Sequence, residues 1–470
     1  MTNGIVAELT GIKLRDKRLS KQSKKIIEGL SANPEASINA SFKTHSETQA
    51  AYRFFSNDAV SPEEIHHPHR EATIGRMQEQ PVVLLVQDTT ELNYTKHPPK
   101  DARCLNKEDR FGLYEHTSLA VAPNRLCLGV VDVESFDRDP DSLQKSENKK
   151  LERKALLIED KESYRWLRGY RLACELAARC PGTQIVSVAD READIYDIYV
   201  EYRDRLGARA EYIIRANDER TTLERDPERG AKAYCNVREQ VAKTPLFTEK
   251  TIELPATPKR AARKAHLEIR AMTVTLKPPA TRPQMESVTH NVVLVQEVSG
   301  PGDGTDVNWL LFTTLLIDTA DAVLTIINYY AARWMVEIYF HTLKSGCRVE
   351  EIQLEKVARL KRCLAFYRII AWRVLHVTYL NRVSPELPCT AEFSDNEWKS
   401  VWRVVTKTEI PETPPTIGAF VRILTALGGY NNRAKERPPG AEVLWVSLRR
   451  MTDFAMAWLA FGPETRKSCV

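Results

Sequence analysis

The sequence lacks the features that would insert this chain into a membrane or hold it together with disulfide bonds. Its nine cysteines are scattered without one Cys-x-x-Cys pair, which favours reduced thiols and argues against a structural zinc site. The first 18 residues contain no apolar signal core, and the most apolar later stretch, residues 363–380, is interrupted by Arg368, Arg373 and His376. We therefore expect a cytoplasmic protein that is neither secreted nor inserted into a membrane.

The sequence also has little excess charge of either sign. Its 68 Lys and Arg residues and 63 Asp and Glu residues leave a net charge of +5, so a nucleic-acid argument must depend on local clusters. Residues 12–25 form such a cluster, with seven Lys or Arg against one Asp, followed by apolar residues at helical spacing. This basic helix, which includes Lys17, Arg18 and Lys21, is suited to contact DNA phosphates, although a solvated helix face has the same composition.

At 470 residues the chain is long enough for two to four domains. Short β-branched apolar runs alternate with amphipathic stretches at residues 81–92, 162–180, 183–190 and 210–217. This alternation of strands and helices predicts an α/β core. Residues 216–308 instead alternate apolar with polar side chains between Pro- and Gly-rich turns, which predicts an antiparallel β insertion. Residues 309–315 then return to a buried strand, and Asp318 or Thr319 is placed to cap the long helix that follows.

The segment 330–344, YAARWMVEIYFHTLK, is predicted to lie on that helix. At about 100° per residue its polar side chains fall on one stripe, and the remaining circumference carries no other charge. The members of the stripe are Tyr330, Arg333, Glu337, His341 and Lys344. A helix without an ordinary solvated face that carries charge along one line indicates a functional surface.

Two of the predicted strands end in a carboxylate, at Asp88 and at Asp190. In an open α/β sheet both would emerge beside each other at the strand ends, where ligand sites tend to lie. Glu337 on the later helix would supply a third oxygen donor. Oxygen donors without accompanying Cys or a His-x-x-x-His helix suit hard cations such as Mg²⁺. Two such ions ~3.5–4 Å apart would activate the attacking oxygen and stabilise the leaving oxygen of a phosphodiester.

Each carboxylate also has a purely structural interpretation. Asp190 is placed to cap the helix that begins READI, and Asp88 is equally suited to a turn. Glu337 can form an ion pair with Arg333 four residues earlier or a hydrogen bond with His341 four residues later. The sequence leaves these alternatives open.

One further polar cluster is weaker. The motif HHPH at residues 66–69 is similar to a zinc-binding group, but Pro68 is expected to spoil its presentation on a helix, and no partner ligand is apparent.

Three blocks of the sequence together resemble a known family. Tyr330, Arg333, Glu337 and Lys344 have the order and spacing of the Y-R-E-K signature of bacterial insertion-sequence transposases with a DDE active site. QDTT around Asp88 and ADREADIY around Asp190 resemble the other two catalytic blocks of that family. Further segments look like its terminal regions: LRDKRLSK, NPEASI and AAYRFFSN near the start, and RPPGAEVLW near the end.

The resemblance implies a ribonuclease-H-like catalytic core interrupted by the β insertion, with helical N-terminal and C-terminal regions. It implies that Asp88, Asp190 and Glu337 hold two Mg²⁺ ions, which Mn²⁺ can replace. Tyr330, Arg333 and Lys344 would position phosphates of the transposon end, and Arg215 matches another DNA contact. Trp309 matches an aromatic residue that stacks on an extruded base, although a core tryptophan at a strand start is the alternative.

The function implied by the resemblance is cut-and-paste transposition through nicking, hairpin formation and strand transfer. The implied partners are transposon-end inverted repeats, target DNA and a second copy of the chain in a homodimeric complex. A structure-selective nuclease with the same core and a catalytically silent DNA-binding regulator descended from a transposase remain the alternatives.

The expected domain organisation has five parts. Residues 1–75 form a helical DNA-binding domain, 76–215 and 309–380 the two parts of the catalytic core, 216–308 the β-rich insertion, and 381–470 a helical dimerisation region.

Overall fold

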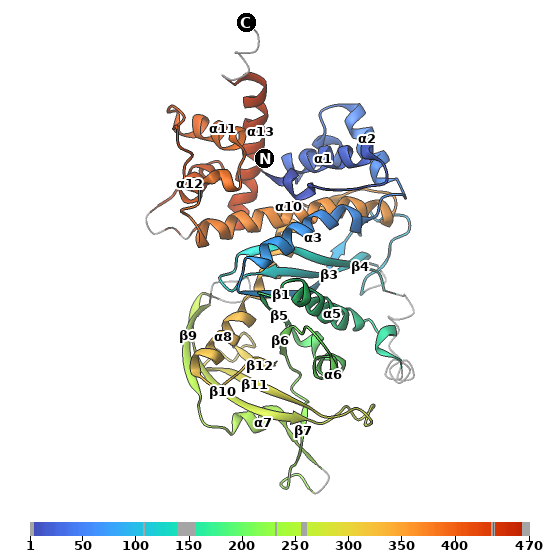
Figure 1. Cartoon of the computed structure of the whole chain (residues 1–470), viewed down its shortest axis with the longest axis vertical. Coiled ribbons are helices and arrows are strands. Elements are labelled where there is room, and N and C mark those ends of the chain that lie inside the picture. Colours follow the sequence, from blue (N-terminus) through green and yellow to red (C-terminus); the bar gives the residue numbers. More distant parts are fainter. Residues whose placement is uncertain are drawn as a thin grey trace. The chain divides into compact units, whose positions relative to one another are not determined.

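The computed structural model describes residues 4–106, 109–138, 156–230, 233–254, 261–433, 436 and 438–462 (Figure 1). The chain divides into two compact units. The first unit comprises Met1–Met77, Thr89–Gln144 and Trp334–Val470, and the second comprises Gln78–Asp88 and Lys145–Arg333. Each unit is therefore assembled from stretches that are distant in the sequence, and the division falls within strand β1 (Val82–Asn93).

The second unit contains a sheet whose parallel part is built from the start of β1, β5 (Gln184–Ala189) and β6 (Glu211–Arg215). Its antiparallel part continues from β6 in the order β12 (Asn308–Thr313), β11 (Val288–Val298), β10 (Arg263–Leu276), β7 (Thr221–Arg225) and β8 (Tyr234–Asn236), while β9 (Thr248–Leu254) pairs with β10. The parallel strands consist mainly of buried aliphatic residues, as strands covered on both faces require. The predicted α/β fold with an antiparallel insertion is confirmed.

The described helices of the second unit are α5 (Tyr164–Arg179), α6 (Tyr196–Asp204), α7 (Val237–Ala242) and α8 (Ala320–Ala331). Helix α5 packs so closely on the sheet that a Cβ atom added at Gly169 would lie 1.9 Å from the Gln87 side chain. Of the two candidate caps for α8, Thr319 takes the role, and its hydroxyl accepts a hydrogen bond from the Ala322 amide at 3.2 Å.

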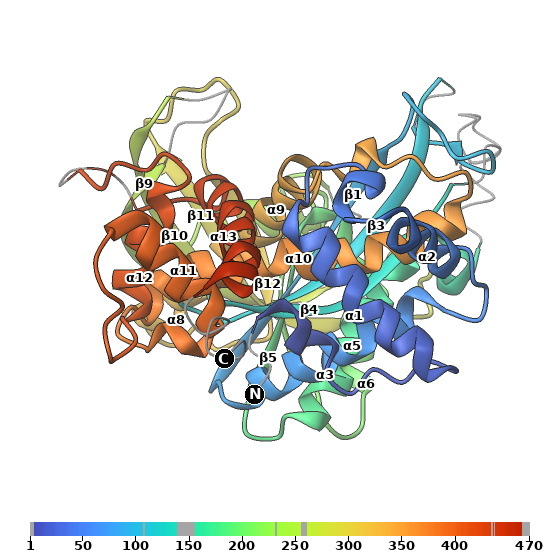
Figure 2. The same ribbon diagram turned by 90° about the horizontal axis from the view of Figure 1, so that it is seen from above.

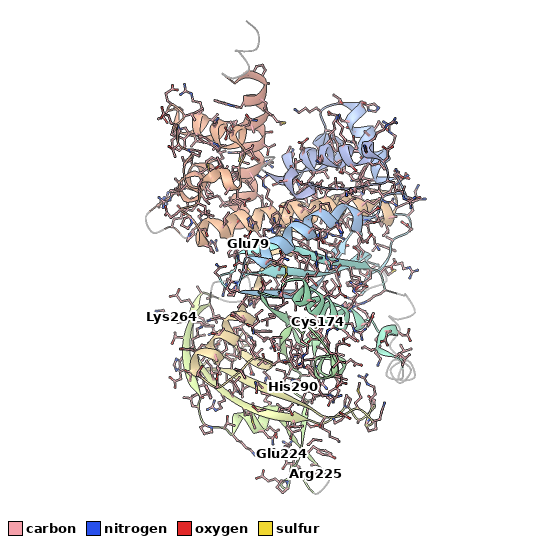
Figure 3. The ribbon with its side chains drawn as sticks, viewed as in Figure 1. Glu79, Cys174, Glu224, Arg225, Lys264 and His290 are labelled. Atoms are coloured by element: carbon pink, nitrogen blue, oxygen red, sulfur yellow. The ribbon has the colours of Figure 1, made fainter. Side chains whose placement is uncertain are left out.

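An aromatic cluster fills the core of the second unit around His290, which Figure 3 labels. The His290 ring stacks on Phe312 with ring centroids 5.4 Å apart, and its Nδ1 lies 2.8 Å from the Tyr212 hydroxyl. Burial lowers the pKa of His290 to about 3, so the ring is neutral at pH 7. This cluster supports the side of the unit on which β6, β11 and β12 lie together.

The first unit combines a small antiparallel sheet with most of the helices. The end of β1, β2 (Arg103–Cys104), β3 (Phe111–Val121) and β4 (Cys127–Phe136) form the sheet. The helices are α1 (Lys17–Ala32), α2 (His45–Phe55), α3 (Pro62–Gln78), α9 (Trp334–His341), α10 (Val357–Val383), α11 (Asp395–Thr406), α12 (Ile417–Ala426) and α13 (Ala441–Phe461). Helices α11, α12 and α13 lie together (Figure 2), and their apolar faces form one core with the C-terminal half of α10.

Helix α3 runs through the HHPH motif, so the prediction that Pro68 would spoil a helix there is wrong. His69 is fully buried in this helix, and its two ring nitrogens lie 2.5 Å from the Glu8 carboxylate and 3.1 Å from the Val130 amide. These contacts explain the histidine as a structural residue rather than a zinc ligand.

The predicted single helix over 330–344 is also wrong. Helix α8 ends at Ala331, Ala332 and Arg333 form a turn, α9 begins at Trp334, and a π-helical segment follows at Thr342–Gly346. The Ala332 and Arg333 amides donate to carbonyls three and four residues earlier, which closes α8 in a tightened last turn. The stripe from Tyr330 to Lys344 is therefore distributed over three elements.

The eight cysteines within the described ranges are free thiols. None of the helices in this described part has the length and apolar character that a membrane span requires.

Candidate active site

Asp190 follows directly after β5 and begins the short helical turn Arg191–Ala193. Its carboxylate accepts a hydrogen bond from the Glu192 amide at 3.0 Å, so the capping role that the sequence suggested is real. The side chain is half-buried. Capping fixes the direction of the carboxylate at the carboxyl end of a parallel strand, where ligand sites tend to lie.

Asp88 lies inside β1, so the prediction that the strand ends there is wrong. The parallel pairing with β5 nevertheless stops at Val86, whose partner is Val188. Asp88 and Asp190 each lie two residues beyond this pair, and residues two apart on a strand share one face. By this register, Asp88 and Asp190 lie at the same distance beyond the last paired residues of the two strands.

Arg333 forms an ion pair with Asp88, with its guanidinium nitrogen 2.8 Å from a carboxylate oxygen. Both side chains are less than one fifth exposed. The turn between α8 and α9 thus places the arginine of the Y-R-E-K block against the carboxylate of the QDTT block. The sequence did not suggest this partner for Arg333.

Tyr330, at the end of α8, is buried and lies beside Trp309 from β12, with ring centroids 5.0 Å apart in an edge-to-face arrangement. Burial raises the pKa of the Tyr330 hydroxyl, whereas the positive charges of Arg333 and Arg215 oppose that rise and the charge of Asp190 adds to it. Residues from four separate segments of the second unit therefore surround the Tyr330 side chain or influence the pKa of its hydroxyl.

Arg215 ends β6, next to the strand that leads to Asp190. One of its guanidinium nitrogens donates to the Asn308 carbonyl at 3.2 Å, and its Nε is buried without a hydrogen-bond partner. A partly exposed guanidinium whose Nε has no partner among the described residues is suited to a further anionic acceptor.

Glu337 and Lys344 belong to the first unit. Glu337 lies in the first turn of α9 and is half-buried. Lys344 lies in the π-helical segment, where the Cys347 amide donates to the Thr342 carbonyl five residues back at 2.9 Å. Burial lowers the pKa of Lys344, and the carboxylates of Glu350 and Glu91 oppose that effect.

The basic cluster of residues 12–25 includes the first turns of helix α1. The Asp16 carboxylate caps this helix by accepting from the Arg18 amide at 2.8 Å, and Lys17, Arg18 and Lys21 are exposed. No acidic residue lies in the first turn. Cations at a helix N-terminus add to the positive end of the helix dipole, so this end is suited to bind anions.

One residue of the ADREADIY block was not singled out from the sequence. Asp194 is buried and binds Arg220, the Asn217 amide and the Tyr199 hydroxyl. Its position four residues after Asp190 was the available signal, but only the structure supplies its partners.

The donor set suits a divalent cation in part. Within the described ranges, no three His, Cys, Asp or Glu side chains gather in a group that could hold a metal ion. Asp88 and Asp190 are nonetheless half-buried oxygen donors on one face of neighbouring strands, and oxygen is the ligand type that Mg²⁺ and Mn²⁺ prefer.

Three family models match the chain and together cover most of it. Residues 2–60 match a model described as Transposase DNA-binding, residues 171–372 match Transposase DDE domain, and residues 369–459 match Transposase Tn5 dimerisation domain. The chain belongs to the DDE transposases, and the ribonuclease-H-like core expected from the resemblance is that of the DDE domain. Its DNA-binding and dimerisation matches identify it further as a transposase of the Tn5 type, which forms dimers and binds DNA.

Proposed function

We propose that this transposase performs cut-and-paste transposition with Asp88, Asp190 and Glu337 as its catalytic carboxylates. The observation that carries the proposal is the 2.8 Å ion pair between Arg333 and Asp88. This ion pair joins the Y-R-E-K block to the QDTT block. It lies at the same height in the sheet as the end of the neighbouring strand β5, which Asp190 follows. Glu337 enters the proposal through its place in the Y-R-E-K block of a DDE transposase.

The three carboxylates would hold two Mg²⁺ ions, with Mn²⁺ able to replace them. When bound, these ions lower the pKa of water and stabilise the leaving oxygen of a phosphodiester. The residues themselves supply negative charge and fixed direction. The Asp190 carboxylate is held by the hydrogen bond that it accepts from the Glu192 amide, and Asp88 is held by Arg333.

The cationic and phenolic residues of the motif blocks would grip DNA phosphates. Arg333 and Arg215 present guanidinium groups, which bind phosphate through two parallel hydrogen bonds. Tyr330 would donate its hydroxyl, which its raised pKa keeps protonated, and Lys344 would add a further cation. Such contacts fix the register of the transposon end without reading its sequence.

The reaction sequence starts with hydrolysis of one strand at each transposon end. The freed 3′-hydroxyl then attacks the opposite strand, which closes a hairpin on the transposon end, and water opens that hairpin. The same 3′-hydroxyl finally attacks a phosphodiester of the target DNA, so each joining step exchanges one phosphodiester for another and needs no ATP. Trp309 would stack on the base that leaves the duplex during hairpin closure.

The terminal regions would assemble the complex. Residues 1–75 would bind the inverted repeat through Lys17, Arg18 and Lys21, residues 76–215 and 309–380 would form the catalytic core around the insertion 216–308, and residues 381–470 would pair two subunits. Each subunit would cut the end that its partner mainly binds. The protein would work in the bacterial cytoplasm, at the nucleoid while bound to DNA.

Substitution of Glu337 by Gln tests the catalytic assignment. The amide keeps the size of the side chain but removes its charge, so we expect nicking, hairpin closure and strand transfer to fall together, while transposon-end binding persists. Glu351→Gln, which changes an exposed carboxylate that pairs with Arg348, is the matched control. A Glu337→Gln protein that still nicks at a near-normal rate would remove the metal-ligand assignment.

Two assays separate the proposal from its rivals. Pre-cut ends incubated with plasmid and Mg²⁺ should give strand-transfer products, which a structure-selective nuclease with the same core would not form. A silent DNA-binding regulator would bind the ends and neither cut nor join them.

A further inference from the structure

Asp194 is a buried carboxylate whose oxygens are both in use. Its side chain is fully shielded from solvent, and the Tyr199 hydroxyl donates to it at 2.6 Å. Arg220 donates to it from two nitrogens, with the shortest distance 2.7 Å. The Asn217 amide donates to the second oxygen at 2.7 Å. A carboxylate this well satisfied holds its surroundings in one arrangement.

These bonds join two loops at the carboxyl ends of neighbouring parallel strands. Asp194 closes the turn that begins at Asp190 after β5. Asn217 and Arg220 lie in the loop that follows Arg215 after β6. One side chain therefore ties the loop of a proposed catalytic carboxylate to the loop of a proposed DNA contact.

Further polar contacts reinforce this connection between the two loops. Arg191 pairs with Asp218 at 3.5 Å, and Arg238 donates to the same Asp218 carboxylate at 2.7 Å. Arg238 also donates to the Asn308 side chain, whose backbone carbonyl accepts from Arg215.

On the side of α5, the buried Arg165 binds Glu192 at 2.7 Å. Arg191 and Glu192 thus each have a charged partner, and the Asp194 side chain is fully shielded from solvent.

Burial lowers the pKa of Arg220, but the charge of Asp194 outweighs this and raises it. Arg220 therefore carries its charge, and removal of Asp194 alone leaves that buried charge uncompensated.

We propose that Asp194 and Arg220 are positioning residues that hold Asp190 and Arg215 in register with each other. This inference rests on the proposed function, because it assumes that Asp190 is catalytic. The pair acts through the backbone: it fixes the Asn217 amide and the turn that Asp190 caps, and it contacts no substrate. Its loss would let the two loops move independently while the strands remain paired.

Three variants test the inference. Asp194→Asn keeps the size of the side chain but leaves Arg220 without a charged partner. Adding Arg220→Met removes both charges, a change that commonly restores stability when a buried ion pair is replaced. Asp197→Asn is the control, because Asp197 lies three residues after Asp194, in α6, and forms a comparable two-nitrogen pair, with Arg282 at 2.6 Å, that ties neither loop.

We expect the melting temperature to fall in Asp194→Asn and to recover in the double variant, whereas the nicking rate should stay at least about tenfold low in both, the factor of one lost charge-assisted hydrogen bond. Hydrogen exchange at the Glu192 and Asn217 amides should accelerate in both variants. In Asp197→Asn, both the binding of transposon-end DNA and the hydrogen exchange at these two amides should match those of the unmodified protein.

The inference is overturned if nicking recovers together with the melting temperature, because the pair would then serve stability alone. Unchanged exchange at both amides in Asp194→Asn would overturn it as well. Failure of the proposed function is seen separately: an Asp190→Asn protein that nicks normally would reject the catalytic role of Asp190, while the exchange data would still decide whether Asp194 holds the loops.

Discussion

Arg333 and Asp88 are 245 positions apart in the chain, yet the guanidinium lies 2.8 Å from the carboxylate. Under the proposed function, one of these residues binds a metal ion and the other a DNA phosphate. The same arginine therefore neutralises Asp88 and is a candidate to bind DNA, so its loss has one consequence, at Asp88, that the loss of another DNA-binding cation lacks.

The first prediction compares Arg333→Ala with Lys344→Ala. Both should weaken assembly of the protein with transposon ends and reduce the log–log salt slope by ~0.9 for each lost phosphate contact. Only Arg333→Ala should also shift the Mg²⁺ concentration needed for nicking, because it removes the charge beside Asp88. Mobility-shift assays over a salt series and nicking over a Mg²⁺ series measure the two effects, and identical Mg²⁺ curves for both variants would deny the special role of Arg333.

The second prediction concerns Trp309. Its substitution by Ala should leave the first nick intact and slow hairpin closure, because base–aromatic stacking contributes ~1–3 kcal/mol and is used only when a base leaves the duplex. Trp309→Phe retains an aromatic ring against Tyr330 and should show a smaller loss. Nick and hairpin products are resolved on denaturing gels. An equal loss at both steps would instead indicate that Trp309 serves the packing seen against Tyr330.

The third prediction concerns the exposed start of α1. Reversal of Lys17, Arg18 and Lys21 to Glu should weaken transposon-end binding and flatten its salt dependence by about 2.7 log units per log unit, at ~0.9 for each contact. A control with the same charge change is the triple reversal of Lys407, Arg422 and Arg450, which are also exposed. If the slope is unchanged by the α1 reversal, the transposon end binds elsewhere.

The parts of the site that could be predicted were those with a local signal. The run before Asp190 is a buried β-branched strand with a capping residue after it, and the structure has both. The end of the strand at Asp88 was misplaced, because Asp88 is polar and the strand continues through Thr89 and Thr90, which are good strand formers. Register, rather than strand length, brings the two carboxylates to the same level.

No sign of the break between α8 and α9 was visible in the helical periodicity of the sequence. Residues 330–341 contain neither Gly nor Pro, so local propensity favours one continuous helix. The opposite error occurred at Pro68, where a residue that usually breaks helices lies inside α3. Tertiary packing decides both cases: His66 and His69 on either side of Pro68 are buried, and Arg333 in the turn is held by Asp88.

Contacts between residues distant in the chain were out of reach of the sequence. Asp194 and Arg220 are separated by a helix and a strand, and many other pairs of opposite charge in this chain have comparable spacing. The same holds for Glu8, whose carboxylate accepts from Arg76 at 2.9 Å and lies 2.5 Å from His69.

The last prediction uses this acidic residue near the start of the chain. Burial alone would raise the pKa of Glu8, but the hydrogen bonds and charges of His69 and Arg76 outweigh burial and lower the pKa to about 2 from 4.5. The folded pKa is depressed, so the stabilisation is present above pH 4.5 and is lost as the pH falls towards 2. At neutral pH the His69 ring is uncharged, because burial lowers its pKa, so it stabilises the Glu8 carboxylate through the hydrogen bond while Arg76 supplies the charge.

Glu8→Gln should therefore lower the free energy of unfolding of the first unit at pH 7, and its difference from the unmodified protein should shrink steadily between pH 4.5 and pH 2. Glu71→Gln on α3 is the control, because Glu71 is partly exposed and lies 4.0 Å from the surface residue His67, a pair of the kind that contributes little. Urea unfolding followed across this pH range measures both differences. A Glu8→Gln deficit that stays constant down to pH 2 would mean that lost packing, rather than the charge of Glu8, accounts for the effect.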